Sequence, residues 1–97
     1  MAAFTVNPET LREAAGRIEQ ACADFNTTTG QVSRAATTLA ENWEGTARNS
    51  FIQEQEHRVM WFSQISQLAM EIADRLKQIA QQYEDAEMEN VNTISAR

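Results

Sequence analysis

The 97-residue sequence predicts an all-α protein, an antiparallel two-helix hairpin that dimerises into a four-helix bundle. Three observations predict this fold. Apolar residues recur at alternating steps of three and four in both halves of the chain, which is the pattern of an amphipathic helix. One proline and three glycines are too few to punctuate many short strands. A Trp-x-Gly sequence at residues 43–45 lies near the centre, where a reversal would place two long helices side by side.

The first helix is predicted to span about residues 8–42. Asn7 can cap the free N–H groups of the first turn, and Pro8 has no N–H to leave unpaired there. The apolar phase continues across residues 27–30, where threonines and a glycine lower helix propensity, so we expect one helix rather than two. Its residues expected in the core or the dimer interface are Leu11, Ile18, Phe25, Val32 and Leu39.

The second helix is predicted to span about residues 46–87. No glycine or proline interrupts the sequence after Gly45, so the helix can run for about 40 residues, or about 60 Å. Past residue 87 the apolar rhythm is lost, and residues 88–97 are expected to form a flexible tail. The residues of this helix expected in the core or the dimer interface are Phe51, Trp61, Ile65, Leu68, Ile72, Leu76 and Ile79.

The Trp-x-Gly sequence is explained by its position in the link between the two predicted helices. Gly45 can adopt the backbone conformation that ends the first helix, and Trp43 can close the end of the apolar core. A short link makes the helices antiparallel neighbours within a single domain of residues 1–97. A lone hairpin would bury only part of each apolar face, so we expect a dimer, although a monomer with a groove for another partner is the alternative.

Composition and charge exclude several classes of function. The net charge of -6 provides no positive field for a nucleic acid partner. The sequence shows neither a Sec-type signal peptide nor a run of about 18 apolar residues that could span a membrane. With Cys22 as the only cysteine, no internal disulfide is possible.

No catalytic, cofactor-binding or metal-binding residues are predicted. The serines lack a glycine elbow, and His57 is the only histidine that could activate one. Glu54 and His57 have the Glu-x-x-His spacing of di-iron bundles, but the apolar face of the first helix offers no inward acids to complete such a site. Glu54 and Arg58 are better explained as a polar pair that fixes the register of a dimer.

The pattern as a whole resembles a known family. Trp43-Glu44-Gly45 at the centre, heptad-patterned helices on both sides, and Tyr83 followed four residues later by Glu87 are similar to the WXG100 family of the early secretory antigenic target. Members of that family are substrates of the bacterial type VII (ESX/Ess) secretion system. The resemblance covers essentially the whole chain.

The resemblance implies a non-enzymatic protein, made in the bacterial cytoplasm and exported as a folded dimer by a non-Sec route. It also implies that Trp43 and Gly45 of one subunit lie near Tyr83 and Glu87 of the other, forming a composite signal for an FtsK/SpoIIIE-type ATPase. Because one chain carries both halves, a homodimer is favoured over pairing with a second WXG-type protein. The alternative is an intracellular adaptor or chaperone for a larger exported helical protein or toxin.

Overall fold

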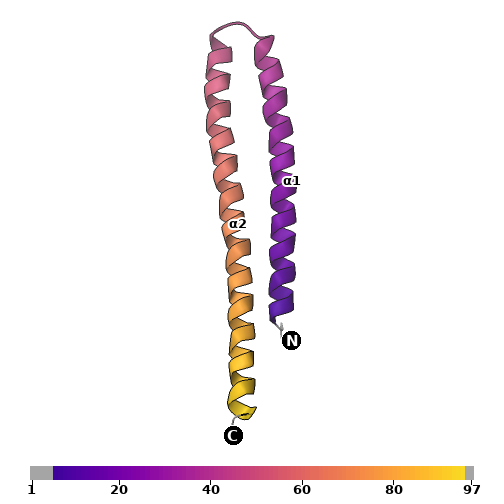
Figure 1. Cartoon of the computed structure of the whole chain (residues 1–97). Helices are drawn as coiled ribbons and strands as arrows, with labels where there is room; N and C mark the ends of the chain where they lie inside the picture. Colours follow the sequence, from indigo (N-terminus) through magenta and orange to yellow (C-terminus); the bar gives the residue numbers. More distant parts are fainter. Residues whose placement is uncertain (1–5, 96–97) are drawn as a thin grey trace, which may run out of the picture.

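The computed structural model describes residues 6–95, with side chains described up to Val91. It consists of two antiparallel helices, α1 (Pro8–Glu41) and α2 (Thr46–Ser95), and the described residues contain no strand (Figure 1). The molecule is a rod of 80 × 27 × 20 Å. The predicted all-α hairpin is confirmed.

The first helix begins at the capping sequence. Asn7 Oδ1 accepts a hydrogen bond of 2.9 Å from the Thr10 backbone N–H, and Thr10 Oγ1 accepts one of 3.0 Å from the Asn7 N–H. This reciprocal capping box satisfies backbone donors that the first turn would otherwise leave free. α1 then passes through residues 27–30 without interruption, and the hydroxyls of Thr27 and Thr29 bond to carbonyls of the preceding turn.

The chain reverses between Glu41 and Thr46. Gly45 has a φ of 117°, a conformation that side-chain-bearing residues rarely adopt. The Trp43 N–H donates to the Ala40 carbonyl at 3.4 Å, and the Arg48 N–H donates to the Gly45 carbonyl at 3.1 Å. The first contact continues α1 into the link and the second opens α2.

Small residues form the centre of the hairpin. The buried apolar residues are Ala15, Cys22, Ala40, Ala73 and Ala80. Among the described residues no large side chain is fully buried. The helices therefore approach closely along a line of alanines and a cysteine, with Phe25 and Phe62 packed edge to face at 5.7 Å farther along.

The residues of α2 expected in the core or the dimer interface divide between two faces. Phe51, Leu76 and Ile79 are half-buried in the hairpin. Trp61, Ile65, Leu68 and Ile72 are 37–59% exposed, whereas Phe62, Ala69 and Ala73, each one position later, are buried or half-buried. The sequence pairs Leu68 with Ala69 and Ile72 with Ala73, so α2 carries two adjacent apolar faces. The alanine face packs against α1 because small side chains allow the closest approach of the helix axes, and the face with the larger side chains is left outside.

The second helix is also longer than the apolar pattern predicts. A flexible tail is expected from residue 88, but α2 continues to Ser95, and residues 96–97 lie outside the described part. Residues such as Met88 and Glu89 favour helix, and no glycine or proline stops it. Backbone hydrogen bonds within a helix are local, so this segment extends past the start of α1 (Figure 1).

Candidate functional site

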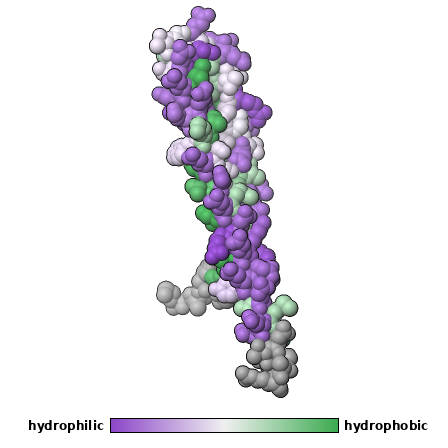
Figure 2. All heavy atoms as spheres, turned by 60° about the vertical axis from the view of Figure 1, so that its left-hand side comes forward, coloured by the Kyte–Doolittle hydropathy of each residue, from purple (hydrophilic) through white to green (hydrophobic). Residues whose placement is uncertain are grey.

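An exposed apolar surface follows both helices. We call it the outer stripe, and it comprises Val32 (46% exposed), Leu39 (53%), Trp61 (59%), Ile65 (37%), Leu68 (59%) and Ile72 (56%). Figure 2 shows hydrophobic side chains reaching the surface in a broken line along the rod. Beside the stripe, Ile18, Ala21 and Phe25 of α1 and Ala69 of α2 line a shallow groove of about 370 Å³ together with Ile65 and Ile72. Exposed large apolar side chains gathered along one surface indicate a site of association.

An aromatic ladder holds the centre of the outer stripe in place. Phe25 of α1 contacts Phe62 of α2 edge to face, and Phe62 stacks on Trp61 with ring centroids 6.2 Å apart. Trp61 is therefore oriented from inside the hairpin while its other face stays open. A rigid, half-exposed tryptophan is typical of residues that dominate protein interfaces.

The stripe becomes polar toward the turn. Glu54 and Arg58 form an ion pair of 3.8 Å, with both side chains more than half exposed. The predicted pairing of these residues is present within one chain. Whether it also sets the register of a dimer stays a prediction.

The Trp-x-Gly link is fixed against the start of α2. The half-buried Trp43 packs on Phe51 with ring centroids 5.5 Å apart, and Arg48 Nε donates a hydrogen bond of 2.7 Å to the Ala40 carbonyl. Arg48 thus supplies a cation to the carbonyl end of α1, which is favourable because that end carries partial negative charge. Sequence reasoning missed this residue. The available indication was that the last turn of α1 contains no basic residue, so a cation near its carbonyl end has to come from outside that turn.

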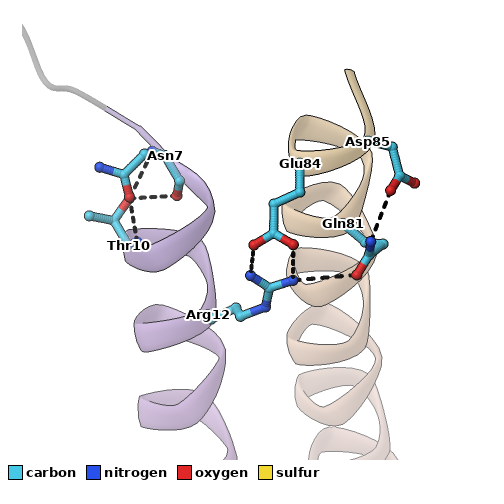
Figure 3. Close-up of polar contacts among 6 residues, drawn as sticks. All are labelled: Asn7, Thr10, Arg12, Gln81, Glu84 and Asp85. Carbon is cyan, nitrogen blue, oxygen red and sulfur yellow. Dashed lines mark hydrogen bonds and ion pairs between the residues drawn. The ribbon is translucent and has the colours of Figure 1, made fainter. Parts of the chain in front are cut away.

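The Tyr-x-x-x-Glu element lies on α2 near the open end of the hairpin. Tyr83 is 49% exposed, and Glu87 is exposed. Glu84, between them, receives a two-pronged ion pair from Arg12 of α1, with Nη2 and Oε2 3.1 Å apart (Figure 3). Arg12 Nη2 also donates to Gln81 Oε1 at 3.5 Å.

Near this open end, ion pairs add to the apolar contacts of the buried Ala15 and Ala80. The hydrogen bond from Arg12 lowers the pKa of the Glu84 carboxyl, and the same contact raises the pKa of Arg12. Two turns nearer the centre, Lys77 Nζ lies 2.8 Å from Glu19 Oε1, and the hydrogen bond to that carboxylate raises the pKa of Lys77. Neither cross-helix pair is evident from the sequence, because their meeting depends on the register of the two helices.

The two elements that the family resemblance singles out lie at opposite ends of the rod. Trp43 and Gly45 form the link at one end, and Tyr83 and Glu87 lie near the other (Figure 1). About 40 helical residues separate them, or about 60 Å. One chain therefore cannot bring the two elements together, whereas an antiparallel second copy could.

Neither a cluster of metal ligands nor a bilayer-spanning helix occurs among the described residues. Within this part of the chain, no three His, Cys, Asp or Glu side chains gather in a way that could hold a metal ion, and His57 is exposed. No helix among the described residues combines the length and the apolar character needed to cross a bilayer. Cys22 is buried, with Sγ 3.9 Å from the Ser66 carbonyl.

These features define a small helical hairpin with an exposed apolar surface, the outer stripe, of the kind that binds a partner. The sequence model of the WXG100 family, described as proteins of 100 residues with WXG, matches residues 3–88. The chain belongs to the WXG100 family. The match includes both Trp43–Gly45 and Tyr83–Glu87.

Solved structures share the fold. The secreted protein EsxB of Bacillus anthracis superposes with a TM-score of 0.81 at 22% identity, covering 90% of this chain and 99% of that protein. EsxA of Geobacillus thermodenitrificans superposes with a TM-score of 0.75 at 22% identity, covering 92% of this chain and 96% of that protein. No curated protein matches the sequence.

Proposed function

We propose that this protein is a small secreted protein, exported as a folded antiparallel homodimer by a type VII (ESX/Ess) secretion system. The observation that carries this proposal is the family match over residues 3–88, which contains both the Trp-x-Gly link and the Tyr-x-x-x-Glu element. The similar fold of Bacillus anthracis EsxB, described as a secreted protein, supports it.

The outer stripe supports the dimer. Six large apolar side chains lie 37–59% exposed along it, and covering them would remove from water the apolar area that the narrow hairpin core leaves out. A two-fold axis near the middle of the rod would set stripe against stripe, since a symmetric dimer uses the same surface on both subunits. The same axis would bring Trp43 of one subunit toward Tyr83 of the other.

In this proposal the protein acts by binding rather than by catalysis. The composite surface of Trp43, Gly45, Tyr83 and Glu87 is read by an FtsK/SpoIIIE-type ATPase of the secretion machinery. After export the dimer serves as an effector, a binding module or a co-secreted partner, and it requires no cofactor.

A second candidate function rests on the same outer stripe. The stripe would equally accept an apolar helix of a larger exported protein or toxin, in which case the chain is an intracellular adaptor or chaperone. The two functions differ in the oligomeric state of the purified chain. A dimer at micromolar concentration supports the first, whereas a monomer that dimerises only with a second helical protein supports the second.

The export test uses a host strain with a type VII system and a matched strain lacking its FtsK-type ATPase. The chain is detected by immunoblot in the culture medium and in the cells. We expect the wild type in the medium of the first strain only, and we expect Trp43→Arg and Tyr83→Ala to stay in the cells although both remain folded. Export of both variants at the wild-type level would refute the proposed composite signal.

A further inference from the structure

The Arg12–Glu84 ion pair is placed inside the element proposed as an export signal. Glu84 is the residue after Tyr83, and its carboxylate takes both Nη atoms of Arg12 while Gln81 Oε1 takes a further contact of 3.5 Å (Figure 3). Bidentate contacts between guanidinium and carboxylate fix the relative orientation of the two groups more tightly than a single point contact does. Arg12 thus connects the start of α1 to one defined side of α2.

That connection acts together with the buried Ala80, one turn earlier, on which way the neighbouring side chains point. Successive residues of an α-helix are rotated by about 100°, and residues four apart share a face. With Glu84 held against α1, Tyr83 and Glu87 lie together on a different side of α2, where Tyr83 is 49% exposed. A rotation of α2 that released Glu84 would change the direction of both residues.

The start of α1 is itself well held. Arg12 lies within the second turn of α1, directly after the capping box of Asn7 and Thr10. On α2, Gln81 is fixed in turn by a hydrogen bond of 3.0 Å from its Nε2 to Asp85 Oδ1. The guanidinium therefore joins two locally ordered segments (Figure 3), near the end of the hairpin where α2 extends past α1 (Figure 1).

We propose that Arg12 is a positioning residue for the export signal, which it orients by holding Glu84 against α1 so that Tyr83 and Glu87 face outward together. This inference rests on the proposed function. In it Arg12 and Glu84 are not read by the secretion machinery. Their partnership, and not the identity of either side chain, sets the presentation of Tyr83.

The test is a charge exchange measured by export. Arg12→Glu and Glu84→Arg each place two like charges together, and we expect each to lower the ratio of exported to cellular protein by about two- to fivefold, the upper part of the range measured for exposed ion pairs. The double variant Arg12→Glu/Glu84→Arg restores the pair in reverse and should restore export to near the wild-type ratio. Lys77→Glu, which likewise places two like charges together at the Glu19–Lys77 pair on the same helices, is the matched control and should export normally.

Thermal unfolding of all four variants separates orientation from stability. The inference is supported if the single exchanges lose export, the double exchange regains it, and Lys77→Glu exports normally with a similar change in melting temperature. It is overturned if the single exchanges export normally, if the double exchange stays as defective as the single ones, or if export simply follows melting temperature across the set. Tyr83→Ala run in parallel keeps the two ideas apart. Normal export of that variant refutes the role of Tyr83 in the proposed composite signal, whereas its loss beside normal export of Arg12→Glu refutes only the role of Arg12.

Discussion

Replacing Trp61 by alanine tests whether the outer stripe is a dimer interface. Trp61 is 59% exposed in the single hairpin. A tryptophan side chain buries about 200 Å² when fully covered, so a partner that covers the exposed part removes about 120 Å² from water. At about 25 cal/mol per Å² this contributes about 3 kcal/mol per copy and about 6 kcal/mol per symmetric dimer, as an upper bound. Realising only half of that bound would still raise the dimer dissociation constant by about a hundredfold.

The measurement is sedimentation equilibrium over a dilution series, with far-UV circular dichroism to confirm that the helices are intact. Met60→Ala is the control, because Met60 is 63% exposed and adjacent in sequence but does not belong to the outer stripe. We expect Trp61→Ala to shift the protein toward monomer and Met60→Ala to leave the wild-type equilibrium. Equal dissociation constants for wild type and Trp61→Ala, or a wild type that is already monomeric at micromolar concentration, would refute the reasoning.

Three further predictions concern the turn and the open end. Gly45→Ala should lower the free energy of unfolding by about 1–3 kcal/mol, because an alanine backbone is strained at the φ of 117°. As the control, Gly16→Ala should raise the free energy of unfolding by about 0.5–1 kcal/mol, because an added Cβ meets nothing within 4 Å there. Denaturant titration measures both changes. Arg48→Met should destabilise the protein by about 1–2 kcal/mol, because the hydrogen bond to the Ala40 carbonyl is lost. In a Trp61→Phe background, where Trp43 is the remaining tryptophan, Arg48→Met should also change the fluorescence of Trp43. Arg34→Met is the control and should leave that fluorescence unchanged, because the hydrogen bond of Arg34 stays within α1. The lowered pKa of Glu84 means that its pair with Arg12 stabilises the fold above the ordinary glutamate value of 4.5 and is lost as pH falls below it. The melting temperatures of wild type and Glu84→Gln should therefore differ at pH 7, and the difference should shrink as pH falls below 4.5. A difference that stays constant or grows over that acidic range would contradict this assignment.

Periodicity and local turn chemistry were enough to predict the hairpin. The capping role of Asn7 and the glycine turn depend only on neighbouring residues, and both are visible in the sequence. A heptad pattern, however, does not say which of two adjacent apolar faces meets the other helix. The three-and-four stepping predicts Leu68 and Ile72 for the core or the dimer interface, and in the hairpin they lie exposed beside Ala69 and Ala73.

The candidate site was predictable to a different degree. Trp43, Gly45, Tyr83 and Glu87 stand out because a family pattern names them, and their role in export stays a prediction. Contacts across the hairpin stayed hidden, because they depend on the vertical offset of α1 against α2. Arg12 meets Glu84 over a separation of 72 residues, which no local pattern encodes.

The line of alanines between the helices makes the hairpin unusually intolerant of added volume. Most protein cores are destabilised when a large side chain is truncated and leaves a cavity, but Ala15, Ala73 and Ala80 have only a methyl group to remove. An extra methylene or branch at one of these alanines would push the two helices apart and tilt one against the other. Because the two helices are long, a small opening at one alanine grows toward their ends. The separation of the helices, from the turn to the open end, is therefore governed by the alanines.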